Sequence, residues 1–113
     1  AEPLRQGEAL TLLIVDLVRF SRINESIGAL AGDELILTVA RRLRHQSRPG
    51  DVIARIGGDE FALLGTTRPS EDGAASLARR VRAVFENPFR IGELMINVDC
   101  AVGGIAALTI PSE

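Results

Sequence analysis

The fold is decided by the stretch DVIARIGGDEFALL, which occupies residues 51–64. Residues 51–56 alternate loosely between polar and apolar side chains, which predicts a β-strand. Gly57-Gly58 is a hairpin signal, and residues 60–64 are apolar enough to form the returning strand. The sequence therefore predicts an antiparallel hairpin with an acidic turn in the middle of the chain.

Upstream of this hairpin, the sequence predicts one strand and two helices. The apolar run 10–15 has the length of a strand that is covered on both faces, and Asp16 follows at its carboxyl end. A first helix is expected to end near Gly28, and a second helix is expected to begin at 32–33. The apolar side chains that recur at helical spacing in the first helix are Phe20, Ile23, Ile27 and Leu30.

Downstream of the hairpin, the pattern predicts a helix over 74–86, a small hairpin over 89–96 and a last strand over 97–107. Met95 and Cys100 are expected in the core beside these last strands. The order of elements predicts an α+β fold with a central, mostly antiparallel sheet flanked by helices.

Composition narrows the class of protein. The chain has 113 residues, which suits one domain, and its 13 Lys and Arg against 15 Asp and Glu give a formal net charge of -2. This balance argues against binding of a nucleic-acid polymer through a basic field. The single cysteine excludes an internal disulfide, and no apolar run reaches the ~18–20 residues of a membrane span. We expect a cytoplasmic domain without direct membrane contact.

Acidic residues are expected to meet at one end of the sheet. Asp16 leaves the end of a buried strand, and Asp59 and Glu60 follow the Gly57-Gly58 turn. Carboxylates are the ligands of hard cations such as Mg²⁺, which complete their shell with water and substrate phosphates. Glycines without side chains let a ligand approach the backbone. A metal–nucleotide site is one interpretation, and an ordinary polar hairpin turn is the other.

The motifs taken together resemble the GGDEF domain of diguanylate cyclases. Residues 57–61 spell the motif that names the family, and residues 13–24 are similar to its DxDxFKxIN segment. Residues 26–35 resemble its GHxxGDxxL segment, and residues 101–106 resemble its late SxGIA strand. The resemblance covers about residues 10–107 in the right order and spacing.

The resemblance implies a palm-like sheet that binds GTP with Mg²⁺ or Mn²⁺. Two such domains face each other as a homodimer and join two GTP molecules into cyclic di-GMP, with release of pyrophosphate. The implied catalytic and metal-binding residues are Asp16, Asp59 and Glu60, of which Glu60 is a metal ligand or the base for the attacking 3'-hydroxyl. The implied substrate-binding residues are Asn24 and Asp33 for the guanine and Gly57 and Gly58 for the phosphates.

A second motif precedes the hairpin. Arg48-Pro49-Gly50-Asp51 fits the pattern RxxD, which in the family marks an inhibitory product-binding site. An arginine fork can bond a phosphate or a guanine edge, and an aspartate can accept from guanine. Arg79 or Arg80 could complete this site from the next helix, and the exposed face of a basic helix explains these two arginines equally well. The alternative is an ordinary loop that ends a helix with Arg48 and starts a strand with Asp51.

Four positions depart from the family pattern, of which Glu25 in place of Asp is a mild change. Val18 stands where Asp is usual, Ser21 where Lys is usual and Ala29 where His is usual. These changes leave two main hypotheses: an active diguanylate cyclase, or a degenerate module that binds GTP or cyclic di-GMP and regulates an attached domain such as an EAL phosphodiesterase. A structural dimerisation domain without a ligand is a third hypothesis.

The boundaries of the chain carry a further expectation. Residues 1–113 read as a single GGDEF domain without the helical motifs that usually flank the family's core. We therefore expect a fragment of a larger bacterial signalling protein with a flanking sensory or EAL-type domain, either free in the cytoplasm or as the cytoplasmic part of a membrane-anchored protein.

Overall fold

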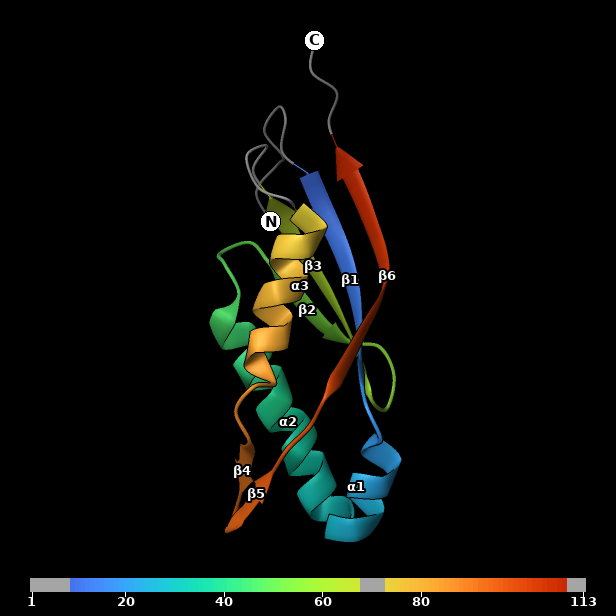
Figure 1. Ribbon diagram of the computed structural model, residues 1–113, viewed down its shortest axis with the longest axis vertical. Helices are drawn as coiled ribbons and strands as arrows, with labels where there is room; N and C mark the ends of the chain where they lie inside the picture. Colours follow the sequence, from blue (N-terminus) through green and yellow to red (C-terminus); the bar gives the residue numbers. More distant parts are fainter. Residues whose placement is uncertain (1–8, 68–72, 110–113) are drawn as a thin grey trace.

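The computed structural model describes residues 9–67 and 73–109. The strands form an antiparallel sheet with helices packed against it, which confirms the predicted α+β class (Figure 1). In chain order the elements are β1 (Ala9–Leu17), α1 (Phe20–Ile27), α2 (Ala29–Gln46), β2 (Val52–Arg55), β3 (Glu60–Thr67), α3 (Gly73–Val84), β4 (Phe89–Ile91), β5 (Leu94–Ile96) and β6 (Cys100–Thr109).

The main sheet has the strand order β2-β3-β1-β6, and each neighbouring pair is antiparallel. This order, with α2 between β1 and β2 and α3 between β3 and β6, is that of two interlocked split βαβ units. Both helices pack on the same face of the sheet (Figure 1). The predicted hairpin is the β2–β3 pair, and the small hairpin forms a separate sheet of β4 and β5.

The core lies between the sheet and the two long helices. Side chains along β1 alternate, so that Leu13, Val15 and Leu17 are buried on the helix side. In β3 the same side carries Phe61 and Leu63. The helices contribute Leu35, Ile36, Val39, Leu43, Leu77, Ala78, Val81 and Val84 to this core. The side chains that alternate with these along β1 and β3 therefore lie on the other face of the sheet, where polar groups can be placed.

Three predictions about the helices were wrong. The second helix begins at Ala29 rather than at 32–33, because Gly28 adopts a φ of 90° and turns the chain directly from α1 into α2. Leu30 consequently belongs to α2 and is 85% exposed, rather than part of the apolar side of α1. The third helix ends at Val84, before the predicted end at 86.

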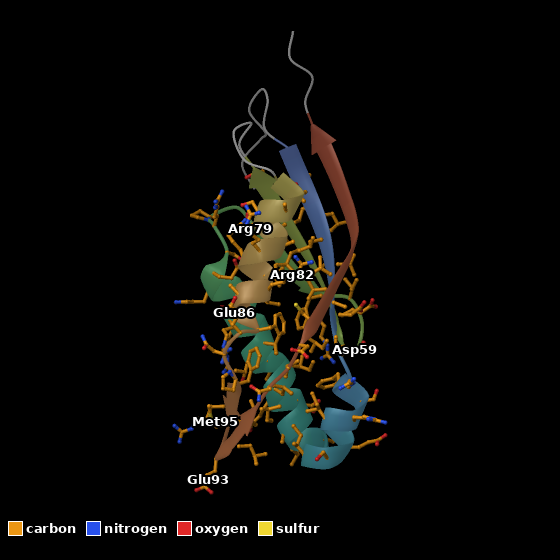
Figure 2. The ribbon with its side chains drawn as sticks, viewed as in Figure 1. Asp59, Arg79, Arg82, Glu86, Glu93 and Met95 are labelled. Atoms are coloured by element: carbon orange, nitrogen blue, oxygen red, sulfur yellow. The ribbon has the colours of Figure 1, made fainter. Side chains whose placement is uncertain are left out.

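The last strands also differ from the expectation. Met95 is exposed on the β4–β5 hairpin rather than in the core (Figure 2). Cys100 is half-buried at the start of β6, and burial raises the pKa of its thiol. None of the helices in the two described ranges has the length and apolar character that a bilayer span requires.

Candidate functional site

Two carboxyl groups face each other at the end of the two central strands. Asp16 near the end of β1 is the register partner of Glu60 at the start of β3. The amide of Leu17 donates to the carbonyl of Asp59 at 2.9 Å, which ties the end of β1 to the β2–β3 loop. Because directly paired residues share a face, Asp16 and Glu60 lie on the same side of the sheet, opposite to the buried Phe61.

The proximity of these groups changes the protonation of Glu60. A hydrogen bond with Asp16 raises the pKa of Glu60, and the charges of Asp16 and Asp59 and partial burial act in the same direction. Two carboxyl groups this close favour either a shared proton or a cation between them. A proton or a cation would therefore stabilise the pair, whereas two ionised carboxylates without a cation would repel each other.

The oxygen donors present fit Mg²⁺ better than a softer metal. Mg²⁺ is commonly held by one or two carboxylates, with water and phosphate oxygens in its remaining positions. Within the described ranges, no group of three or more His, Cys, Asp and Glu side chains is arranged to hold a metal. The structure pairs Asp16 with Glu60 across the two strands. Asp59 lies on the adjoining loop (Figure 2).

The glycine turn beside the carboxyl groups is held by an arginine. Arg55 donates through Nε to the carbonyl of Gly57 at 3.0 Å and through Nη2 to the carbonyl of Gly58 at 2.7 Å. A Cβ atom built on Gly58 meets no atom within 4 Å, so the space beside the turn is open. Our sequence reasoning did not assign a role to Arg55; its position directly before the Ile56-Gly57-Gly58 turn is the only sequence signal for it.

The predicted guanine ligands lie at the junction of α1 and α2. Asn24 is half-buried on α1, and its side chain lies against Gly32 of α2, where a Cβ atom would collide with the Asn24 Oδ1 atom. Glycine at position 32 is therefore required by close packing. Asp33 is the next residue of α2 and is exposed. The fold places Asn24 and Asp33 near one another, at the same helix junction.

The RxxD motif is tied to α3. Asp51 accepts a hydrogen bond from the backbone amide of Arg48 at 2.9 Å, and its Oδ2 atom lies 3.7 Å from Nη1 of Arg80. The side chain of Asp51 is 5% exposed and that of Arg80 is 21% exposed, whereas Arg79 is exposed on the outer side of α3 (Figure 2). Of the two arginines expected near this motif, Arg80 is the one that reaches it.

The Asp51–Arg80 pair has unused hydrogen-bonding capacity. Oδ1 of Asp51 and all three side-chain nitrogens of Arg80 are buried, and within the described part of the chain none of them has a hydrogen-bond partner. Buried polar groups without partners are costly, and they are rare in native proteins. This cluster is therefore a second place where a polar ligand would satisfy groups that the fold leaves unsatisfied.

An open pocket of about 610 Å³ lies elsewhere, between the end of α3 and the start of β6. Its lining consists of Arg82, Phe85, Glu86, Asn97, Asp99 and Cys100. None of the residues that we predicted to bind metal, GTP or product lines it. The pocket therefore does not belong to the carboxylate site.

Comparison with known proteins agrees with the resemblance in the sequence. A family model described as "Diguanylate cyclase, GGDEF domain" matches residues 1–112. The chain is 38% identical over 86 residues to diguanylate cyclase TpbB of Pseudomonas aeruginosa, covering 76% of this chain and 20% of that protein. It is 36% identical over 99 residues to diguanylate cyclase DgcP of the same species, covering 88% of this chain and 15% of that protein.

Solved structures agree at the level of the fold. The crystal structure of the GGDEF domain of TpbB from Pseudomonas aeruginosa has a TM-score of 0.76 and 36% identity, and the match covers 88% of this chain and 62% of that one. An EAL/GGDEF domain protein from M. capsulatus has a TM-score of 0.77 and 36% identity, over 91% of this chain and 66% of that one. The chain spans a fifth or less of the full lengths of TpbB and DgcP. By sequence and by fold, the chain belongs to the GGDEF family of diguanylate cyclase domains.

Proposed function

We propose that this domain supplies one half of a diguanylate cyclase active site. The reaction would use two GTP molecules, and the 3'-hydroxyl oxygen of each would attack the α-phosphate of the other. Two phosphodiester bonds would form and two pyrophosphates would leave, giving cyclic di-GMP. The observation that carries this proposal is the pairing of Asp16 with Glu60 beside the open Gly57-Gly58 turn.

In this proposal the Asp16–Glu60 pair would hold Mg²⁺, or Mn²⁺ in its place, and Asp59 would join as a third ligand by moving from its position in the structure, where the three side chains are not grouped. When bound, the ion would neutralise negative charge on the phosphates, which is a large part of catalysis in phosphoryl transfer. Glu60 in its ionised form could also accept the proton of the attacking hydroxyl, since carboxylates act as general bases. The open space at Gly58 would admit the phosphates without a side-chain clash.

Asn24 and Asp33 would select guanine. A carboxylate can accept from both N1–H and N2–H₂ of guanine, and an amide can donate to its carbonyl oxygen. The packing of Asn24 against Gly32 supports this assignment, because it fixes the amide next to the backbone of Asp33. A homodimer would be needed, since each domain would contribute one GTP to the product.

A second function is supported by the Asp51–Arg80 cluster. Arg48, Asp51 and Arg80 would bind cyclic di-GMP, because phosphates accept hydrogen bonds from guanidinium groups and guanine donates to carboxylates. This site would inhibit an active cyclase. If Val18, Ser21 and Ala29 prevent turnover, the same site would make the domain a cyclic di-GMP receptor for an attached domain. Among relatives, MucR is named as a bifunctional cyclase and phosphodiesterase and NbdA as a phosphodiesterase.

The deciding experiment measures GTP turnover with Mg²⁺ and separates the products by chromatography and mass spectrometry. The protein should carry its native flanking sequence, and Glu60→Gln should be compared with the exposed control Glu93→Gln. For a cyclase, we expect cyclic di-GMP from the unmodified protein and the control, and at least about a hundredfold slower production by Glu60→Gln. Binding of GTP or cyclic di-GMP without turnover would contradict the cyclase and support the receptor.

A further inference from the structure

The glycine turn is held in one orientation by the strand that precedes it. The guanidinium of Arg55 bonds the carbonyls of both Gly57 and Gly58, at 3.0 and 2.7 Å. A guanidinium is planar, and its donors form a rigid fork. Two successive carbonyls on one fork therefore point to the same side of the turn.

This arrangement also decides where two amides point. In a trans peptide the N–H is directed opposite to the C=O of the same unit, and the described residues contain no cis peptide bond. The carbonyl of Gly57 shares its peptide with the amide of Gly58, and the carbonyl of Gly58 shares its peptide with the amide of Asp59. Both amides are consequently directed away from Arg55.

The alternation of the strands relates this direction to the carboxyl groups. Arg55 lies two residues after Ile53 in β2, so both side chains are on the same side of the sheet, and Ile53 packs against the core on the helix side. Glu60 is the neighbour of the buried Phe61 in β3, so its side chain points to the other side of the sheet, where Asp16 also lies. Amides directed away from Arg55 therefore lie toward the side of the sheet that carries the two carboxyl groups.

These two amides are also available to a ligand. Among the turn and loop backbone bonds of the described residues, none has the amide of Gly58 or Asp59 as its donor. Successive backbone N–H groups that point to one side form a concavity that binds anions such as phosphate. Phosphate bound there would lie close to any cation on the Asp16–Glu60 pair.

We propose that Arg55 is a positioning residue, which orients the amides of Gly58 and Asp59 to bind the phosphates of the nucleotide. This inference rests on the proposed GTP site and adds to it a phosphate contact from the backbone. Lysine at position 55 would keep the positive charge but could not hold both carbonyls, because an ammonium group is not a planar fork.

The test compares ligands with and without phosphates. GTP with Mg²⁺ and guanosine are each titrated into the full chain, and binding is followed through backbone amide resonances. Arg90→Lys is the matched control, because Arg90 is also exposed and bonds the carbonyl of the glycine two residues ahead, Gly92, in the other hairpin. We expect Arg55→Lys to weaken GTP binding about tenfold, corresponding to one charge-assisted hydrogen bond or two neutral ones, with guanosine binding within about twofold. Arg90→Lys should change neither.

The possible outcomes separate the inference from the function on which it rests. Equal weakening of GTP and guanosine by Arg55→Lys, or no weakening of either, would overturn the role of Arg55 while the GTP site stands. If the variant does not fold, the unmodified protein still tests the inference. GTP should shift the amide resonances of Gly58 and Asp59, and guanosine should not. Resonances that GTP leaves unshifted would overturn the inference. Absence of GTP binding by the unmodified protein would overturn the proposed function together with it.

Discussion

The pairing of Asp16 with Glu60 makes the metal-free protein sensitive to pH. The hydrogen bond and the neighbouring charge raise the pKa of Glu60 above its usual value of 4.5. A group whose pKa is raised by folding contributes stability that is fully present below its unfolded pKa and is lost as pH rises through the folded pKa. In the absence of metal, the site thus works against stability once both carboxyl groups are ionised.

We predict that Glu60→Gln removes this pH dependence, because the amide still donates to Asp16 and carries no charge. Thermal melting in EDTA between about pH 4 and about pH 8 should show the unmodified protein losing stability relative to Glu60→Gln as the pH rises. Adding Mg²⁺ at the upper end should recover stability in the unmodified protein and have little effect on the variant. Parallel melting curves for the two proteins over the whole range would contradict the prediction, and Glu93→Gln controls for loss of a surface charge.

At the scale of single elements, the sequence predicted strands and helices well and their junctions less well. The β2–β3 hairpin and the buried side of α2 follow from local patterns, because alternation and helical spacing are set by residues close in the chain. The start of α2 was missed because Gly28 joins two helices without a loop, and a glycine is usually interpreted as a helix end.

Side-chain contacts between elements cannot be predicted from such local patterns. The bond of Arg55 to the turn and the ion pair of Asp51 with Arg80 are made by long side chains whose direction depends on the folded backbone. The resemblance to the family supplied the candidate residues of both sites, and the choice of Arg80 over Arg79 required the packing of α3. Residue type and spacing alone would have left the acidic turn as an ordinary hairpin loop.

One arginine of α2 fixes the connection from α3 to β4. Arg42 donates to the carbonyls of Val84, Asn87 and Pro88 at 3.0, 2.7 and 2.6 Å, and its guanidinium lies 3.7 Å from the centre of the Phe89 ring. The carbonyl of Val84 belongs to the last turn of α3, where backbone acceptors have no partner in the helix. Arg42 therefore both caps α3 and holds the segment that follows it against α2.

We predict that Arg42→Leu destabilises the protein by about 2–4 kcal/mol, because it leaves carbonyls without a donor and removes the cation–π contact. Arg42→Lys should lower the free energy of unfolding by less than Arg42→Leu does, since an ammonium keeps its charge over the ring and cannot reach all three carbonyls. The free energy of unfolding in urea measures both. Arg41→Leu is the control, because Arg41 is the exposed neighbour on the same helix. A loss for Arg42→Leu no greater than that of the control would contradict the role as a cap.

Across the whole molecule, the two candidate sites lie at opposite ends of β2. The RxxD motif enters this strand at Asp51, and the glycine turn leaves it after Arg55. A strand of four residues spans only about 13 Å, and β3 pairs with it along its full length. Both sites are therefore attached to one rigid hairpin, while the second site also depends on the position of α3 through Arg80.

Because the two proposed sites use different residues, a substitution in one site should affect the binding of one ligand and not of the other. We predict that Asp51→Asn and Arg80→Gln each weaken cyclic di-GMP binding about tenfold or more, because each removes a charge-assisted hydrogen bond. Binding of GTP with Mg²⁺ should change by no more than about twofold, because Asp16, Glu60 and the glycine turn remain in place. Calorimetric titration of both ligands measures the two effects in the same samples.

The control for this prediction is Arg79→Gln, which removes an equal charge from the exposed side of α3. Arg80→Gln also leaves the buried carboxylate of Asp51 without its counter-charge, so melting temperatures are needed to separate a loss of fold from a loss of binding. Asp51→Asn in turn leaves the buried guanidinium of Arg80 without its counter-charge, so its melting temperature must be compared in the same way. Unchanged cyclic di-GMP binding in Asp51→Asn would remove the RxxD loop from the product site, whereas equal loss of both ligands would mean that the β2–β3 hairpin acts as a single binding element.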